Sequence, residues 1–230
     1  MLYTEENVRA GLRVLDGKRV FSLADGDRLT PAARDWLSRE GVRIAAPSEA
    51  KTVYTTRFGG EFAKKPEEMT HLSGNLLVPK THPRIAFRGA IDTLEAELLL
   101  AQEAAQDKPQ LLSALGEMLD FVRSLVRADV LGETVEQVRL CGLTEQELRE
   151  HSHFPQKYYK QPHFMPSVSD GRAMLRLNRV RTAVRETELA CCRAFCDRDG
   201  VLTRLDLLTA LNRLSALCWI LMIRLKAGQL

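Results

Sequence analysis

The sequence has no strong excess of either charge, because 33 Lys and Arg residues stand against 30 Asp and Glu residues and leave a net charge of +3. A protein that binds nucleic acid usually gathers a larger basic excess on one stripe of its surface. Here the arginines are spread along segments with helical periodicity, so the composition argues against nucleic-acid binding. The sequence also lacks internal repeats and low-complexity segments.

Long apolar runs are missing as well. The most apolar segment, LSALCWILMI at 214–223, is interrupted by Ser215 and has about half the length that a membrane span needs. The first residues, MLYTEENVRAGL, include acidic groups and no continuous apolar stretch, which argues against a secretory signal. We therefore expect no membrane segment and interpret 214–223 as the buried part of a core helix.

Cysteines are few, and their five positions do not have the spacing of a disulfide framework. An odd number of cysteines without such spacing indicates reduced thiols and a cytoplasmic protein. Cys192 and Cys196 stand at i and i+4 in a predicted helix and could in principle hold a soft metal. No histidine lies near them in the sequence, and thiols that pack like small apolar side chains are the preferred interpretation. The sequence thus predicts no His/Cys metal site.

Residues 1–46 are predicted to form a small α/β module. Thr4 opens the first helix with a partial capping box, in which Asn7 stands where Glu is usual. Thr30 caps the second helix, Pro31 takes its first position and Gly41 ends it. The predicted elements are a helix over 4–15, a strand over 18–23, a helix over 29–41 and a strand over 42–46.

Residues 47–82 have no helical period and contain scattered Pro, Gly, Lys and Thr. The segments TVYTT at 52–56 and GNLLVP at 74–79 could pair as short strands. A long irregular stretch inside a compact chain is often functional. The pattern alone predicts a functional or mobile segment between the N-terminal module and the remainder, and the family resemblance described below implies that it binds nucleotide.

From residue 83 onward the pattern is helical, and long helices with short connections indicate an antiparallel bundle. Gly132 is expected to end the second of these helices, Thr144 to cap the third, and Ser169 or Asp170 to cap the fourth. The predicted helices are 83–106, 109–132, 143–153, 169–196 and 201–226, and 154–168 is expected to be a loop.

Two polar stripes interrupt these helices. Arg181, Arg185 and Glu188 stand one turn apart beside the apolar stripe of helix 169–196. Arginine suits phosphate binding because its planar guanidinium is always charged and donates two hydrogen bonds at once. Spacing alone nevertheless favours a solvated face with ion pairs one turn apart. An ion-pair stripe is also the favoured interpretation of Arg84, Arg88, Asp92 and Glu95.

Asn212 and Arg213 interrupt the last, apolar helix. A buried Asn needs partners, because leaving it unpaired costs roughly 1–3 kcal/mol. The pair either bridges helices or faces a ligand, and the spacing does not decide between the two.

Three segments together resemble a known family. PRIAFRGAIDTLEAEL at 83–98, VRTAVRETE at 180–188 and ALNRLS at 210–215 look like the ATP:corrinoid adenosyltransferases of the propanediol-utilisation type. The ethanolamine-utilisation branch is closer still, because segments similar to 29–44 and 64–92 occur there in the same order. The resemblance covers nearly the whole chain and rests on the order and spacing of the segments. It implies a five-helix antiparallel bundle with a small N-terminal α/β module, forming a homo-oligomer that binds ATP between subunits.

The resemblance also implies roles for individual residues. Arg185 and Glu188 match the first Arg and the Glu of the family's RRxER signature and would hold the triphosphate and its Mg²⁺. Asn212, with Arg213 beside it, matches the LNRLSD signature and would contact ATP. Asp92 and Arg181 are similar to a salt bridge across the subunit boundary.

Further candidates come from the segments that flank the bundle helices. Lys80 matches a phosphate-binding lysine just before the first bundle helix. Thr70 and His71 lie where the family's N-terminal phosphate loop should be, although its TGD pattern is absent. HFMPS at 163–167 occupies the place of a FxLPGG loop whose Phe helps displace the lower ligand of cobalt. Phe164 or His163 falls at that position, depending on register. Phe164 keeps the aromatic character, whereas His163 could instead meet cobalt or a phosphate.

The sequence departs from the family pattern at several places. Glu186 and Leu189 replace two arginines of RRxER, and Ala216 replaces the last Asp of LNRLSD. A His…CC-x-x-C metal motif found in some members of the ethanolamine branch is missing, because no cysteine precedes Cys141.

The implied reaction is transfer of the 5′-deoxyadenosyl group of ATP to cob(I)alamin, which would supply adenosylcobalamin for ethanolamine utilisation. The cofactors and substrates are then ATP, Mg²⁺ and cobalamin. A corrinoid reductase or the proteins of a bacterial microcompartment are candidate partners, and the cytoplasm, including such a compartment, is the expected location. The alternatives are a corrinoid-binding or delivery module without catalysis, and a microcompartment assembly protein that acts through its N-terminal module.

Overall fold

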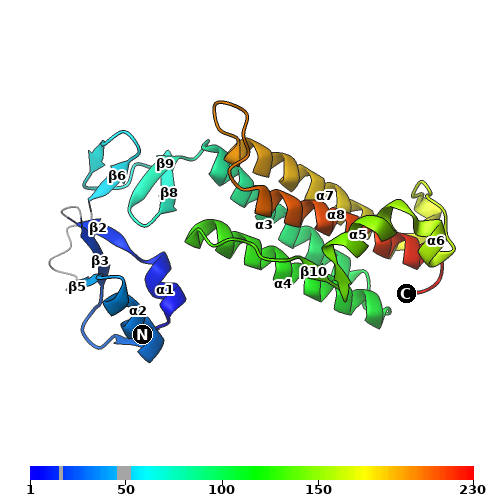
Figure 1. Cartoon of the computed structure of the whole chain (residues 1–230), viewed down its shortest axis with the longest axis horizontal. Helices are drawn as coiled ribbons and strands as arrows, with labels where there is room; N and C mark the ends of the chain where they lie inside the picture. Colours follow the sequence, from blue (N-terminus) through cyan, green and yellow to red (C-terminus); the bar gives the residue numbers. More distant parts are fainter. Residues whose placement is uncertain (16–17, 46–52) are drawn as a thin grey trace. The chain divides into compact units, whose positions relative to one another are not determined.

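Short strands and two short helices make up the described part of the first 82 residues, and mainly long helices make up the rest (Figure 1). The structure, a computed structural model, describes residues 1–15, 18–45 and 53–230. It divides the chain into two compact units, 1–82 and 83–230. The boundary predicted between 46 and 47 lies outside the described residues, as do Ala46 and Thr52 of two predicted strands.

The first helix, α1 (Glu5–Ala10), begins with the predicted capping box. The Asn7 amide N–H donates to Thr4 Oγ1 over 3.3 Å, and the Thr4 N–H donates to Asn7 Oδ1 over 3.0 Å. The predicted extension of this helix to residue 15 is wrong. Gly11 ends the helix, and a Cβ at that position would come within 3.0 Å of the Phe21 ring. The chain beyond it is a strand.

The second helix, α2 (Pro31–Arg39), is confirmed with its cap. Thr30 Oγ1 accepts from the Ala33 N–H over 3.3 Å, and Gly41, with φ of 63°, turns the chain after the helix. Trp36 and Leu37 pack against α1 and the strands. These contacts form the apolar core of the N-terminal unit.

The described strands of this unit form three small sheets, and the predicted pairing of 52–56 with 74–79 is confirmed as a parallel contact between β6 and β9. Asn75 is buried, and its Nδ2 donates to the carbonyl oxygens of Val14 and Val53 over 3.3 and 2.7 Å. The sheets are β1 (Leu2–Tyr3) with β4 (Arg28–Leu29); β2 (Arg13–Leu15), β3 (Lys18–Ser22) and β5 (Arg43–Ala45); and, in spatial order, β7 (Glu61–Phe62), β6 (Tyr54–Thr56), β9 (Leu76–Pro79) and β8 (Met69–Ser73).

Four long antiparallel helices form the second unit, with shorter helices packed beside them (Figure 1). Helix α3 packs against α4 and α7, α7 packs against α8, and α5 packs against α8. Gly132 ends α4 with φ of 70°, and Thr144 caps α5 in a capping box with Glu147, both as predicted. The helices are α3 (Pro83–Glu103), α4 (Pro109–Leu131), α5 (Glu145–His153), α6 (Pro155–Tyr159), α7 (Gly171–Phe195) and α8 (Leu205–Lys226), with a short β10–β11 hairpin (Arg139–Leu140 and Leu143–Thr144) before α5 and a 3₁₀ turn (Val168–Asp170) before α7.

The segment expected to be a loop contains the short helix α6. Proline is favoured in the first turn of a helix, and Pro155 occupies that position. Tyr158 stacks on His151 of α5 at 3.8 Å between ring centroids, and Tyr159 Oη lies 2.8 Å from His151 Nδ1. These contacts with α5 hold a turn of helix that the periodicity of the sequence does not reveal.

Asp170 stands at the expected N-terminal position of α7 but makes no capping hydrogen bond to it. Its carboxylate instead accepts from the Ser167 N–H over 2.7 Å and pairs with Lys226 of α8. The prediction that Asp170 caps α7 by a side-chain hydrogen bond is therefore wrong. Asp170 instead connects the preceding turn to α8.

Helix α8 forms the centre of the bundle core, as the sequence predicted for 214–223. It is long and apolar enough to cross a membrane by length and composition. Ten of its apolar side chains are nevertheless buried against the other bundle helices. Burial against neighbouring helices accounts for its composition.

Three residues of the stripe expected along α3 form ion pairs with α4. Arg84 Nε and Nη2 lie 3.0 and 2.6 Å from Asp129 Oδ1, and Arg88 Nε lies 2.7 Å from Asp129 Oδ2. Glu95 pairs with Arg123 over 3.2 Å. The ion pairs thus connect α3 to α4, and the fully buried Asp129 is a partner that helical spacing could not identify.

Candidate functional site

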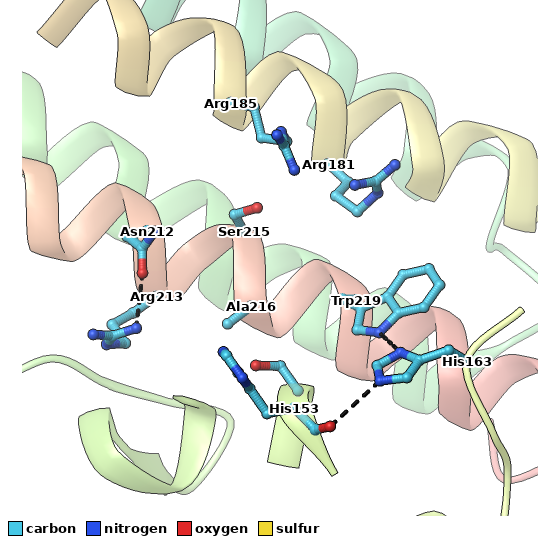
Figure 2. Close-up of a pocket in the computed structure, with 10 residues that line it drawn as sticks. His153, His163, Arg181, Arg185, Asn212, Arg213, Ser215, Ala216 and Trp219 are labelled. Atoms are coloured by element: carbon cyan, nitrogen blue, oxygen red, sulfur yellow. Dashed lines mark hydrogen bonds between the residues drawn. The ribbon is translucent and has the colours of Figure 1, made fainter. Parts of the chain in front are cut away.

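A pocket of about 370 Å³ opens between α7, α8, the end of α5 and the segment after α6 (Figure 2). Three guanidinium groups and two histidines face it, and an indole closes one end. Its lining residues are Ser152, His153, His163, Arg181, Arg185, Asn212, Arg213, Ser215, Ala216 and Trp219.

Arg181 and Arg185 reach from neighbouring turns of α7 toward α8 (Figure 2). Arg181 Nε and Nη2 donate to Asn178 Oδ1 over 3.2 and 3.1 Å. Arg185 makes no ion pair or hydrogen bond with any other residue in the described part of the chain. Burial, and then the positive charge of Arg185, lower the pKa of Arg181. A bound anion would offset this unfavourable concentration of positive charge.

Asn212 of α8 connects this helix to α7 at the other end of the pocket. Its Nδ2 donates to Glu188 Oε1 over 3.2 Å, and its Oδ1 accepts from Arg213 Nη1 over 2.8 Å. Arg213 Nε also lies 3.4 Å from Glu145 Oε1 of α5. Asn212 therefore bridges α7 and α8, as one of the two interpretations expected, and it also lines the pocket; contact with a ligand stays a prediction.

His163 is held between two partners at the pocket wall. Trp219 Nε1 donates to His163 Nδ1 over 3.1 Å, and His163 Nε2 lies 3.3 Å from the carbonyl oxygen of His153 (Figure 2). The indole N–H can only donate, so Nδ1 must accept and Nε2 must carry the proton. The ring planes of His163 and Trp219 differ by 15°, and the Phe164 ring lies 5.4 Å from the Trp219 ring.

Five of the predicted site residues line this pocket, namely His163, Arg181, Arg185, Asn212 and Arg213. Glu188 and Phe164 contact lining residues from just outside it. Asp92 lies exposed on α3 and forms no ion pair with another described residue.

The remaining predicted residues belong to the N-terminal unit. Lys80 Nζ lies 3.6 Å from Glu67 Oε1, and Thr70 and His71 lie on β8. The His71 ring meets Tyr54 edge to face at 5.5 Å. Burial, followed by the charges of Lys65 and Arg13, lowers the pKa of His71.

Trp219 is the main residue that the sequence analysis missed, together with Ser152, His153, Ser215 and Ala216. The tryptophan lies seven residues after Asn212, which places both side chains on one face of α8. Inside an apolar run it was interpreted as part of the core. The seven-residue spacing was the one available signal that it shares the face of Asn212.

The five cysteines differ in their burial and in the side chains around them. Within residues 1–15, 18–45 and 53–230, no three His, Cys, Asp or Glu side chains gather closely enough to hold a metal ion. Cys191 and Cys218 are buried, Cys192 is half-buried and Cys196 is exposed. Small thiols packed in the core explain the first two positions.

Thiol reactivity should follow this difference in burial. Burial raises the pKa of both Cys191 and Cys218 to about 12, so almost no thiolate forms there at pH 8. We expect Ellman's reagent to modify Cys196 first and to reach Cys191 and Cys218 only after unfolding. Cys196→Ser should remove the fast phase, and a fast phase that survives this substitution would contradict the assignment.

The pocket combines an anion-attracting end with an aromatic end, and known proteins are similar to the chain that builds it. Residues 62–225 match the family model described as cobalamin adenosyltransferase. The corrinoid adenosyltransferase EutT of Escherichia coli K12 is 33% identical over 96% of this chain and 90% of the relative. EutT of Salmonella typhimurium is 32% identical with the same coverage. No solved structure is significantly similar to the chain. On this similarity over almost its full length, the chain belongs to the cobalamin adenosyltransferase family.

Proposed function

We propose that the chain transfers the 5′-deoxyadenosyl group of ATP to the cobalt of a reduced corrinoid. The observation that supports this most directly is Arg185, a guanidinium without an ionic partner in the described residues, in a pocket that also contains Arg181 and Arg213. Such a cluster attracts a polyanion, and the Trp219 end of the same pocket offers an apolar surface to a planar ligand.

The reaction is a nucleophilic displacement. The electron pair of Co(I) attacks the 5′ carbon of the ribose, a cobalt–carbon bond forms, and the bond from that carbon to the triphosphate oxygen breaks. The leaving triphosphate takes the electron pair of the broken bond, so no general base is needed. The protein must stabilise the leaving phosphates and hold the ribose carbon in line with cobalt. Arg185 and Lys80 are the proposed phosphate ligands.

Mg²⁺ would accompany the nucleotide. Mg²⁺ is usually bound by one or two carboxylates together with substrate phosphates and water. Glu188 fits this role because its carboxylate stands beside Asn212 at the arginine-rich end of the pocket. When bound, the ion would neutralise charge on the leaving phosphates.

Phe164 and His163 are the proposed residues on the corrin side, where an apolar, water-poor surface would favour loss of the axial ligand of Co(II). With α5 counted beside the four long helices, the second unit would be the five-helix bundle of the family. We further propose a homo-oligomer in which ATP lies between subunits and Asp92 pairs with Arg181 of a neighbouring copy. Thr70 and His71 would complete the phosphate site.

The product would serve an adenosylcobalamin-dependent enzyme of ethanolamine utilisation, such as ethanolamine ammonia-lyase. This places the proposed enzyme in the cytoplasm or in a bacterial microcompartment, where a corrinoid reductase would supply Co(I).

A direct assay tests the proposal. The purified chain is mixed with ATP, Mg²⁺ and chemically reduced cobalamin, and formation of adenosylcobalamin is followed by its visible spectrum. We expect turnover that depends on both ATP and the chain. Corrinoid binding without turnover would contradict the proposal and favour a delivery module. An assembly protein would be favoured if the chain neither binds nor converts the corrinoid, and if it binds a partner protein through residues 1–82.

A further inference from the structure

His163 lines the proposed corrinoid pocket, yet both of its ring nitrogens are already engaged. Nδ1 accepts the Trp219 indole N–H, and Nε2 faces the carbonyl oxygen of His153. A neutral imidazole is the commonest metal ligand among side chains, and it binds through an unprotonated nitrogen. In this arrangement His163 has no free lone pair to offer.

Trp219 is well suited to maintain this state. Its indole ring is nearly parallel to the imidazole, and a hydrogen bond joins Trp219 Nε1 to His163 Nδ1. The rings of Phe164 and Trp219 lie 5.4 Å apart, and the Arg181 guanidinium lies 5.7 Å from the Trp219 ring. Contacts from α7 and from the segment after α6 therefore fix the indole, and with it the donor that occupies Nδ1.

An axial nitrogen on cobalt would oppose the proposed chemistry. A nitrogen ligand donates electron density along the axis into the orbital that must accept the electron when Co(II) is reduced to Co(I). A histidine at the pocket wall with a free nitrogen would therefore hinder formation of the nucleophile.

We infer that Trp219 is a positioning residue that prevents His163 from becoming an axial ligand of the bound corrinoid. This inference rests on the proposed function, because it requires a cobalt corrinoid in the pocket. His163 would then line the pocket with a flat imidazole ring whose Nδ1 lone pair accepts the Trp219 N–H and cannot bind cobalt.

Electron paramagnetic resonance of bound cob(II)inamide tests the inference. This corrinoid carries no nitrogenous base of its own, so any axial nitrogen on the bound cobalt must come from the protein. We expect no nitrogen superhyperfine splitting with the unmodified chain. In Trp219→Phe, which keeps a smaller aromatic ring and lacks the N–H donor, we expect a nitrogen triplet.

A double variant identifies the source of the nitrogen. Trp219→Phe with His163→Phe should lose the triplet again, which a purely structural role of Trp219 would not produce. Trp219→Met, which also lacks the donor, replaces Trp219→Phe if the latter fails to fold by circular dichroism. Bound cobalt with the same spectrum in the unmodified chain and the Trp219 variant would overturn the inference, as would a triplet already present without substitution.

Binding itself separates this inference from the function on which it rests. Equilibrium dialysis of cob(II)inamide against the unmodified chain measures corrinoid binding before any spectrum is recorded. If the unmodified chain does not bind the corrinoid, the proposed function fails and the inference fails with it. If it binds and the Trp219 variants show no nitrogen ligation, the inference alone fails.

Discussion

Replacing Arg185 by alanine is expected to lower kcat/KM for ATP roughly tenfold or more, because the variant loses a charged donor to the leaving phosphates. No described residue forms an ion pair with Arg185, so its removal leaves no buried carboxylate behind. Its side chain is exposed, and the fold should therefore tolerate the change. Initial rates of adenosylcobalamin formation over a range of ATP concentrations give the measurement.

Arg176 provides a matched control on the same helix. It lies nine residues before Arg185, which places it on the opposite side of α7, and it is not among the residues that line the pocket. Arg176→Ala changes the net charge equally and should leave kcat/KM for ATP near the unmodified value. An unchanged value in Arg185→Ala, or equal losses in both variants, would remove Arg185 from the phosphate site.

The helices of the second unit could be predicted from the sequence because their apolar positions repeat with the helical period and their ends have clear signals. Thr144 and Gly132 act locally, so the sequence alone identifies them. The end of α1 could not be predicted in this way. Its helical pattern continues beyond Gly11, but pairing with β3 and the nearby Phe21 ring determine where the chain becomes a strand.

The candidate site was predictable only in part for a similar reason. Arg181 and Arg185 share a helix face, and spacing is enough to associate them. Trp219 and His163 lie 56 residues apart and meet because α8 passes the segment after α6. Helical periodicity describes one helix at a time, so contacts between distant segments appear only when the bundle is assembled.

Asp129→Ala is expected to destabilise the chain by about 3–5 kcal/mol, because it removes the buried carboxylate on which two guanidinium groups converge. Asp129 is almost fully buried, and its two carboxylate oxygens accept from Arg84 and Arg88. Without the carboxylate, the Arg84 and Arg88 guanidinium groups would lose a shared hydrogen-bond acceptor at the partly buried α3–α4 contact. Chemical denaturation followed by circular dichroism measures the change.

Asp120 is the matched control for this substitution. It lies nine residues before Asp129 on the opposite side of α4, and its side chain is 83% exposed, 3.9 Å from Arg123. Asp120→Ala should cost no more than about 1 kcal/mol, as is usual for an exposed pair. Replacing Arg84 and Arg88 by methionine in the Asp129→Ala background should recover part of the lost stability, because it removes the two positive charges that the carboxylate binds. A loss below about 1 kcal/mol in Asp129→Ala would mean that water, and not Asp129, compensates the two arginines.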